Sequence, residues 1–315
     1  HPGSVLRMQH CYVHDSKGGN NVKTRAERNE IYFNWIEGAV YHELELIGPD
    51  GQDPDLKRED SDVVGNVFRK LNDAYMIRIG GDGTGESKGR FRFVNNTFIL
   101  AKEARPVFRI FDGIESVEMR NNVFYRIGGG PITVTRTAEA KWATGVERIA
   151  GSHNWLPRGS ERVPNGWTQT LTGAEPGFVS IDSLDLRPAK GSPLVDAAGD
   201  VSASGADYAI ADALVKVSHS PGRQSIDQVV ARASTSSLDI GAYEAESDLG
   251  STTPKETEGQ ARLPDSARVP PGAGGAAGGR CGCRLGDKDA DNQGPVHVLM
   301  MAMGFAIMSM RRKTR

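Results

Sequence analysis

Charged side chains recur at one position in three short apolar stretches of the sequence. Glu45 lies between two leucines, Arg78 between two isoleucines, and Arg109 between a phenylalanine and an isoleucine. Side chains alternate across a β-strand, so we expect the apolar neighbours to point inward and the three charged groups to form one outward column. Lys23 and Arg25, in Asn-Val-Lys-Thr-Arg, are expected in the preceding repeat, with a register that is ambiguous by two residues.

A stripe of cations on a flat sheet has a definite chemical use. Arginine forks bind carboxylates or sulfates through two parallel hydrogen bonds, which suits an acidic polysaccharide. If the ligand is a uronate, one basic group can remove the C5 proton while others neutralise the carboxylate during β-elimination. The sequence therefore predicts a protein that binds an extracellular acidic polysaccharide, with its cleavage as an open extension.

Two other interpretations of the same residues remain open. The stripe can be a cross-strand charge ladder in which Glu43 and Glu45 neutralise Arg78 and Lys23. Glu43, Glu45 or Asp112 can alternatively supply the carboxylate pair of a glycoside hydrolase. The candidate substrate-binding residues are Glu43, Glu45, Asp82 and Asp112.

The sequence predicts no metal site with a defined motif. Asp50 to Asp55 and Asp82 to Glu86 offer oxygen donors in glycine-rich loops, so calcium is possible, but neither loop fits a defined calcium motif. Histidines occur without ligand-like spacing, and His42 is expected to be a buried structural residue. We find no phosphate-binding glycine loop, no Ser-His-Asp motif and no aromatic platform for RNA, so no nucleic-acid partner is expected.

A loose internal period indicates which elements position these residues. A pattern of alternating apolar residues around an asparagine recurs in steps of 23 to 32 residues, and Cys11 occupies the same frame at the start. The asparagines are Asn34, Asn66, Asn96, Asn122 and Asn154. Asparagine tolerates a left-handed bend and its amide can bond a neighbouring turn, so we expect an asparagine ladder along stacked coils. The pattern predicts an all-β fold, a right-handed parallel β-helix, with a β-propeller as the main rival.

On these repeats, residues 1 to about 245 resemble the right-handed parallel β-helix proteins of the pectate-lyase-like superfamily. Pro176-Gly-Phe-Val and Leu238-Asp-Ile-Gly-Ala-Tyr-Glu resemble the closing segment that follows such coils. The resemblance implies coils over residues 1–160, with further coils upstream, and terminal coils with a closing cap over residues 161–246. We expect the stretch around Ile240 to return to the end coil.

The Val-Lys-Thr-Arg stretch also resembles the lysine-bearing strand of the alginate and chondroitin lyase branch of that superfamily. The resemblance implies that Lys23 is the catalytic base and that Arg25, Arg78 or Arg109 is the carboxylate partner. That branch places acidic calcium ligands shortly before the lysine, whereas this sequence has Ser16-Lys-Gly-Gly there. Calcium-assisted catalysis at that place is therefore not expected.

The composition changes after Glu244. Residues 247–280 are rich in glycine, proline and serine, which is typical of a flexible linker. Cys281-Gly-Cys283 follows, then a polar spacer, the apolar stretch Val296 to Met310 and a basic tail, an order that resembles the C-terminal sorting signal of myxobacterial surface proteins. Fifteen residues make a helix of about 22 Å, shorter than the roughly 30 Å hydrocarbon core. The resemblance implies processing near the cysteines by a sorting machinery, a membrane contact through residues 281–315 and a cell-surface location; an ordinary membrane anchor is the alternative.

A net charge of −2 gives no global preference for a charged partner, so recognition must be local. A non-enzymatic adhesin or structural surface protein with the same fold is the rival function.

Overall fold

The structure is a computed structural model, and the described part of the chain is built from β-strands without an α-helix. It describes residues 3–48, 59–81, 89–101, 106–111, 114–136, 149–201, 210, 213–223, 229–232, 237–246 and 282–287. Three mainly parallel sheets account for most of the strands.

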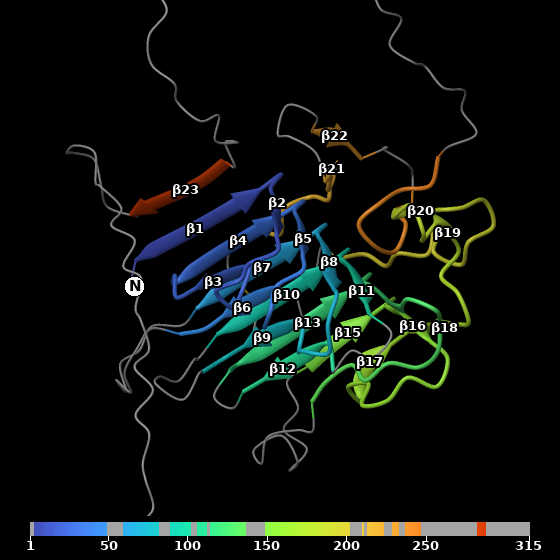
Figure 1. The fold of residues 1–315 in the computed structure, drawn as a ribbon, viewed down its shortest axis with the longest axis horizontal. Helices are drawn as coiled ribbons and strands as arrows, with labels where there is room; N and C mark the ends of the chain where they lie inside the picture. The colour runs from blue at the N-terminus through green and yellow to red at the C-terminus, as the bar shows by residue number, and fades with distance from the viewer. Residues whose placement is uncertain are drawn as a thin grey trace, which may run out of the picture.

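The largest sheet runs along the whole body of the molecule (Figure 1). Its parallel strands are β1 (Ser4–Gln9), β4 (Arg28–Tyr32), β7 (Asp60–Val64), β10 (Arg90–Val94), β13 (Ser116–Arg120), β15 (Ile149–Ser152) and β17 (Gly166–Thr168). Each strand pairs with the one from the next coil, in strict register from β1 to β13. Because partners lie about thirty residues apart and run parallel, separate hairpins and propeller blades are excluded.

Two further sheets complete each coil. The second contains β2 (Tyr12–His14), β5 (Trp35–Glu37), β8 (Val67–Lys70), β11 (Thr97–Leu100), β14 (Val123–Arg126), β16 (Trp155–Pro157) and β18 (Leu171–Gly173). The third contains β3 (Val22–Thr24), β6 (Leu44–Leu46), β9 (Ile77–Ile79) and β12 (Phe108–Ile110). One strand per coil in each sheet defines a parallel β-helix, so the predicted fold class is confirmed.

Inward side chains of the three sheets fill the centre of the β-helix. Phe68, Phe98 and Phe124 come from successive coils and stack with ring centroids 5.4 and 4.8 Å apart. All three are fully buried, as are the inward residues of the neighbouring strands. Burying such a side chain contributes roughly 1.5–3 kcal/mol, so these stacked residues are the main force that holds adjacent coils together.

An asparagine ladder follows the turn between the first and second sheets. The side-chain oxygen of Asn66 accepts hydrogen bonds from the backbone N–H (2.8 Å) and the side-chain amide (2.9 Å) of Asn34, one coil earlier. The same pair of bonds joins each later step, Asn66 to Asn96, Asn96 to Asn122 and Asn122 to Asn154. The five amides are fully buried, so each one satisfies backbone groups that would otherwise lack a partner.

The left-handed bend lies one residue before the place that the sequence indicated. Positive φ angles occur at Phe33 (56°), Asn95 (52°), Asn121 (57°) and Gly65 (66°), each directly before a ladder asparagine. The ladder asparagines themselves have negative φ. The expectation that they provide the bend is therefore wrong, because their amides are used for the bonds between coils and the preceding residue turns the chain.

The segment after β18 follows an unexpected course. It contains two short antiparallel pairs, β19 (Phe178–Ser180) with β20 (Asp185–Pro188) and β21 (His219–Ser220) with β22 (Val230–Ala231). Asn95 donates to the carbonyl of Asp239 and Asn121 to that of Gly199, while Ala242 donates to Thr97. The segment thus lies along the side of the middle coils (Figure 1) and does not return to the end coil as expected.

This course has a physical reason on the second sheet. Its outward side chains are also apolar, and they pack against the C-terminal segment in a second core that contains Trp35, Val67, Ile99, Val123, Trp155, Leu186, Leu194 and Ile240. A sheet that is apolar on both faces must be covered on both faces. The segment therefore supplies an outer layer for this sheet.

Near the C-terminus, one short stretch is described. Gly282–Asp287 forms β23, which pairs antiparallel with β1 and places Cys283 opposite Met8 in the register. The sequence had indicated a spacer there, but the outer edge of β1 offers backbone groups that a strand can pair with. Cys281 and the apolar stretch 296–310 lie outside the described residues. Among the residues that are described, we find no helix long and apolar enough to cross a membrane.

Candidate functional site

The third sheet carries four charged residues in one row on its outward face. Lys23 is paired with Glu45, Glu45 with Arg78, and Arg78 with Arg109 in the strand register. Their strand neighbours point into the core and are buried. We call Lys23, Arg78 and Arg109, with Glu45 among them, the cation column. The pairing of Lys23 with Glu45 removes the ambiguity of two residues in the register of the first coil.

Glu45 lies at the centre of the cation column and is only 2% exposed. Its Oε1 lies 2.9 Å from Nη1 of Arg78, and its Oε2 lies 3.9 Å from Nζ of Lys23. Asn20 donates a hydrogen bond from its side chain to the same Oε2, and Nδ1 of His42 lies 4.0 Å away. A carboxylate enclosed by these groups orients them, and it is not available as the nucleophile of a glycoside hydrolase.

Aromatic rings hold the two arginines of the cation column. The guanidinium carbons of Arg78 and Arg109 lie 4.6 and 4.7 Å from the ring centroid of Phe111. Arg109 also lies 5.7 Å from the ring centroid of Tyr75. Such contacts attract a cation to the ring face while leaving its N–H groups directed along the plane. Sequence reasoning missed both rings, since Phe111 and Tyr75 stand just outside the strands where alternation gives no guidance.

His42 sits beside the cation column in the turn before β6. Its ring Nδ1 lies 3.0 Å from the side-chain oxygen of Asn20, and its backbone N–H donates to the same oxygen at 3.1 Å. Burial, together with the positive charges of Arg78, Lys70, Arg109 and Lys23, lowers the pKa of His42 to about 4. The imidazole is therefore neutral at physiological pH.

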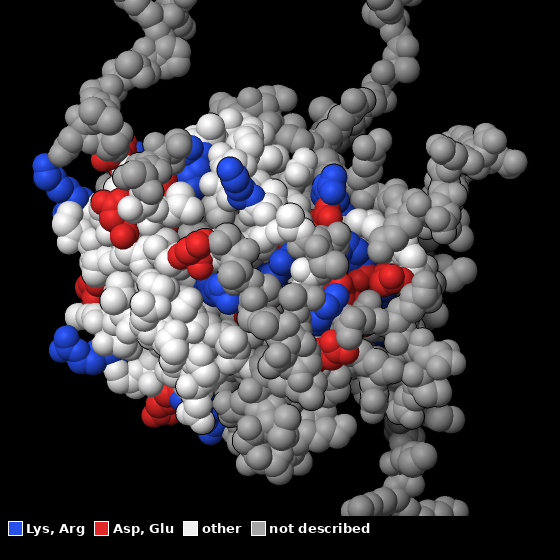
Figure 2. Space-filling view, turned by 180° about the vertical axis from the view of Figure 1, so that it is seen from behind, with Lys and Arg blue, Asp and Glu red and all other residues white. Residues whose placement is uncertain are grey.

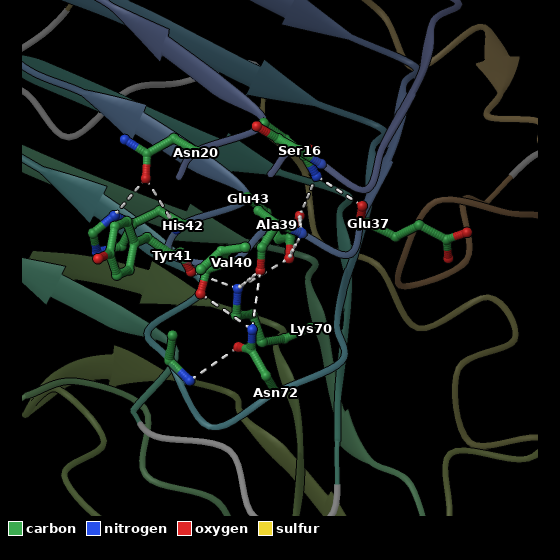
Figure 3. A network of polar contacts seen from close by, with 12 residues as sticks. Ser16, Asn20, Glu37, Ala39, Val40, Tyr41, His42, Glu43, Lys70 and Asn72 are labelled. Atoms are coloured by element: carbon green, nitrogen blue, oxygen red, sulfur yellow. Dashed lines mark hydrogen bonds and ion pairs between the residues drawn. The ribbon is translucent and has the colours of Figure 1, made fainter. Parts of the chain in front are cut away.

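A buried ion pair supports the turn that carries His42. Lys70 Nζ lies 3.2 Å from Glu43 Oε1, and neither side chain has any exposed surface. Lys70 also donates to the carbonyls of Ala39 and Tyr41, at 2.7 and 2.5 Å (Figure 3). Glu43 accepts from the backbone N–H of Ala39 at 3.1 Å, and burial raises its pKa.

This burial corrects the expected role of Glu43. The sequence placed it among the substrate-binding residues, but its carboxylate lies beneath the turn with Lys70 and Asn21 as side-chain partners. Glu43 is in the turn before β6, where strand alternation does not yet apply. We therefore assign it a structural role, and it does not pair with Glu45 across the outward face.

The other candidate residues are dispersed. Arg25 lies after β3 and donates to the carbonyl of Gly48 at 2.6 Å, away from the row itself. Asp82 and Asp112 fall outside the described residues, as do both loops considered for calcium. No group of three potential metal-ligating side chains occurs in the described ranges. The ladder asparagines lie between the other two sheets.

Arg136 lies next to the row in backbone register and was missed by the sequence analysis. A parallel bridge joins Phe108 to Thr135, and the backbone N–H of Arg136 donates to the carbonyl of Phe108 at 3.0 Å. The register thus places Arg136 in the position next to Arg109. The sequence offered no signal for this position, because aligning Thr133-Val-Thr-Arg with Val-Lys-Thr-Arg matches Arg136 to Arg25, which lies away from the row.

Comparison with protein-family models, with curated proteins and with solved structures finds no match to this chain. The parallel β-helix follows from the strand pairing alone. What the cation column does must then be argued from its chemistry. Several donors in a row, spaced at the roughly 4.8 Å distance between neighbouring strands, can bind successive anionic groups of an extended polymer.

Proposed function

We propose that the cation column binds an acidic polysaccharide, and that the protein is displayed at a cell surface. The observation that carries the binding proposal is the order of charges in this row: the register places Arg78 directly beside Arg109 on the outward face, and Glu45 between Arg78 and Lys23. A structural ladder alone would alternate opposite charges, because like charges in adjacent strands destabilise a sheet. An anionic ligand would relieve the repulsion between Arg78 and Arg109.

The geometry suits a sugar polymer for a second reason. The four strands of the third sheet pair without any shift in register. Their outward row therefore follows the β-helix axis. The distance between adjacent strands is close to the length of one sugar residue in an extended chain. Each coil can therefore face one residue of a polyuronate or a sulfated glycan.

β-Elimination is the reaction class that we propose for this site, supported by the resemblance of the Lys23 strand to polyuronate lyases. A non-enzymatic adhesin with the same cation column is the rival. The surface location is supported only by the sequence order of linker, Cys-Gly-Cys, apolar stretch and basic tail in residues 247–315. Formation of an unsaturated uronate end, followed by its ultraviolet absorbance, distinguishes a lyase from an adhesin.

A binding experiment tests the proposal directly. Wild type is expected to bind at least one of polymannuronate, polyguluronate, polygalacturonate and chondroitin sulfate, with an affinity that falls as salt rises. The double variant Arg78→Gln, Arg109→Gln is expected to lose binding about a hundredfold. The matched control Arg90→Gln, Arg120→Gln removes two arginines from the largest sheet and should leave affinity unchanged. Equal losses in both double variants would contradict a specific site.

A further inference from the structure

His42 has a defined tautomer because Glu45 fixes the amide of Asn20. A carboxylate can only accept, so the side-chain nitrogen of Asn20 must face Glu45 and its oxygen must face His42. An amide oxygen can also only accept. The imidazole Nδ1 therefore carries the proton in this contact, and Nε2 of the neutral ring carries the lone pair.

The remaining ring nitrogen is left for an outside molecule. The described contacts of the His42 ring run through Nδ1, to Asn20 and Glu45, while its backbone N–H and carbonyl bond Asn20 and Asn21. The residue is 9% exposed, and Nε2 is not among the fully buried side-chain nitrogens that lack a partner. The residues on both sides of His42 are held in place: Lys70 donates to the Tyr41 carbonyl, and the Glu43 carboxylate accepts from the backbone N–H of Ala39 (Figure 3).

We propose that His42 is the general base and Lys23 the general acid of a β-elimination on the polyuronate bound by the cation column. This inference rests on the proposed function. It differs from the role that the resemblance implied for Lys23, because it assigns the base to the imidazole lone pair of His42 and makes Lys23 the proton donor. Nζ of Lys23 lies near Glu45 on the row, with its side chain 47% exposed.

The elimination transfers one proton to His42 and one from Lys23. Nε2 of His42 takes the C5 proton, and the electron pair of the C5–H bond forms the C4–C5 double bond. The bond from C4 to the glycosidic oxygen breaks, and that oxygen takes a proton from Lys23. Arg78 and Arg109 hold the uronate carboxylate, which carries the developing charge. Proton exchange with water then restores neutral His42 and charged Lys23, and no oxidant, metal or co-reactant is consumed.

The charges around His42 set its strength as a base. It faces Lys23 on β3, Glu45 on β6, Lys70 on β8, Arg78 on β9 and Arg109 on β12. Burial and these cations keep the ring neutral in the free protein. A bound uronate carboxylate opposes the field of Arg78 and Arg109, so it raises the affinity of the imidazole for a proton at the moment when the proton must be taken.

The test separates binding from elimination. We expect His42→Gln to lower the rate of unsaturated-end formation about a hundredfold or more, with affinity for the same polyuronate within twofold of wild type. His14→Gln is the matched control, since His14 is an exposed histidine on β2 of the second sheet. Lys23→Met should also lose rate. The His42 ring resonance, identified by its loss in His42→Gln, should titrate near pH 4, and kcat/KM of wild type should decline on the acid side over the same range.

The possible outcomes distinguish the assignment of the base from the binding proposal. A polyuronate that wild type binds but does not cleave would overturn this inference and leave the binding proposal standing. Cleavage that survives in His42→Gln but vanishes in Lys23→Met would return the base to Lys23. Failure to bind any of the four polymers would overturn the binding proposal and the inference together.

Discussion

The outward faces of the largest and the third sheets are both charged, but they are built differently. On the largest sheet, cations and carboxylates are interspersed over neighbouring coils; we call this array the charge lattice. It contains five arginines, Arg7, Arg28, Arg90, Arg92 and Arg120, and four carboxylates, Glu30, Asp60, Asp62 and Glu118. The cation column has three cations for one carboxylate. Figure 2 shows that positive and negative side chains are also interspersed on the far face of the molecule.

Asp62 shows how the charge lattice is satisfied internally. It has no exposed surface, and it accepts from Nη2 of Arg28 at 2.5 Å and from Nη2 of Arg92 at 2.7 Å. Arg90 binds Asp60 through two nitrogens, at 2.7 and 2.5 Å. Forks closed on carboxylates of the same molecule are not available for a ligand. The comparison teaches that two arginines side by side in register, and not the number of arginines, distinguish the proposed binding face from a structural face.

The largest effect is expected below the cation column, from Lys70→Met. It leaves the fully buried carboxylate of Glu43 without a cation, which costs about 3–5 kcal/mol of unfolding free energy near pH 7. Because burial raises the pKa of Glu43, the folded state holds a proton more tightly than the unfolded chain. The loss should therefore be small below the ordinary glutamate pKa of about 4.3 and should grow as the pH rises through and above it. Urea denaturation at several pH values measures this dependence.

The double variant Lys70→Met, Glu43→Gln is the control for the buried charge. It should recover part of the lost stability at neutral pH and remove the added pH dependence. Equal instability of the single and double variants would show that the lost bonds to the Ala39 and Tyr41 carbonyls, and not the charge, cause the effect.

The second-largest effect tests the charge lattice. Asp62→Ala leaves Arg28 and Arg92 without their shared carboxylate, and we expect a loss of about 2–4 kcal/mol in unfolding free energy. Affinity for the polyanion should stay within twofold, because the third sheet is untouched. A gain in affinity would mean that the freed arginines can also bind the ligand, which would remove the distinction between the two faces.

The cation column could be derived from the sequence because two periods coincide there. Alternation decides the face of Arg78 and Arg109, and the repeat decides the coil, so the position of each side chain follows from counting. His42, Glu43 and Asn20 lie in turns, where neither period applies. Glu43 is paired with Lys70, which comes from a different sheet and a later coil.

The course of the C-terminal segment could not be predicted from the sequence, for another reason. Asn95 and Asp239 are 144 residues apart in the sequence, and no local pattern links them. The apolar outward residues of the second sheet indicate that something must cover them, but they do not say what. The one-residue error in the left-handed bend has a similar origin, since Phe33, Gly65 and Asn95 share no side-chain chemistry.

A smaller effect separates charge from geometry within the cation column. Arg109→Lys keeps the positive charge but loses the flat fork that lies over Phe111 and Tyr75. We expect affinity for the polyanion to fall about fivefold, with little change in stability. The matched substitution Arg90→Lys in the charge lattice should leave affinity unchanged. An unaltered affinity in Arg109→Lys would mean that the column acts only through its overall field.

The smallest effect concerns an aromatic ring at the border of the cation column. Tyr41 is 61% exposed, while its backbone N–H donates to the Gly19 carbonyl at 2.8 Å and its own carbonyl accepts from Lys70. A Cβ on Gly19 would lie 3.1 Å from the Tyr41 ring, so this glycine lets the ring lie against the chain. An exposed ring on a fixed backbone can stack on the apolar face of a sugar. We expect Tyr41→Ala to weaken polysaccharide binding two- to fivefold, equivalent to about 0.5–1 kcal/mol, without loss of stability. Val179→Ala, at a half-exposed site on β19, is the control; equal affinity in both variants would restrict the binding surface to the charged row.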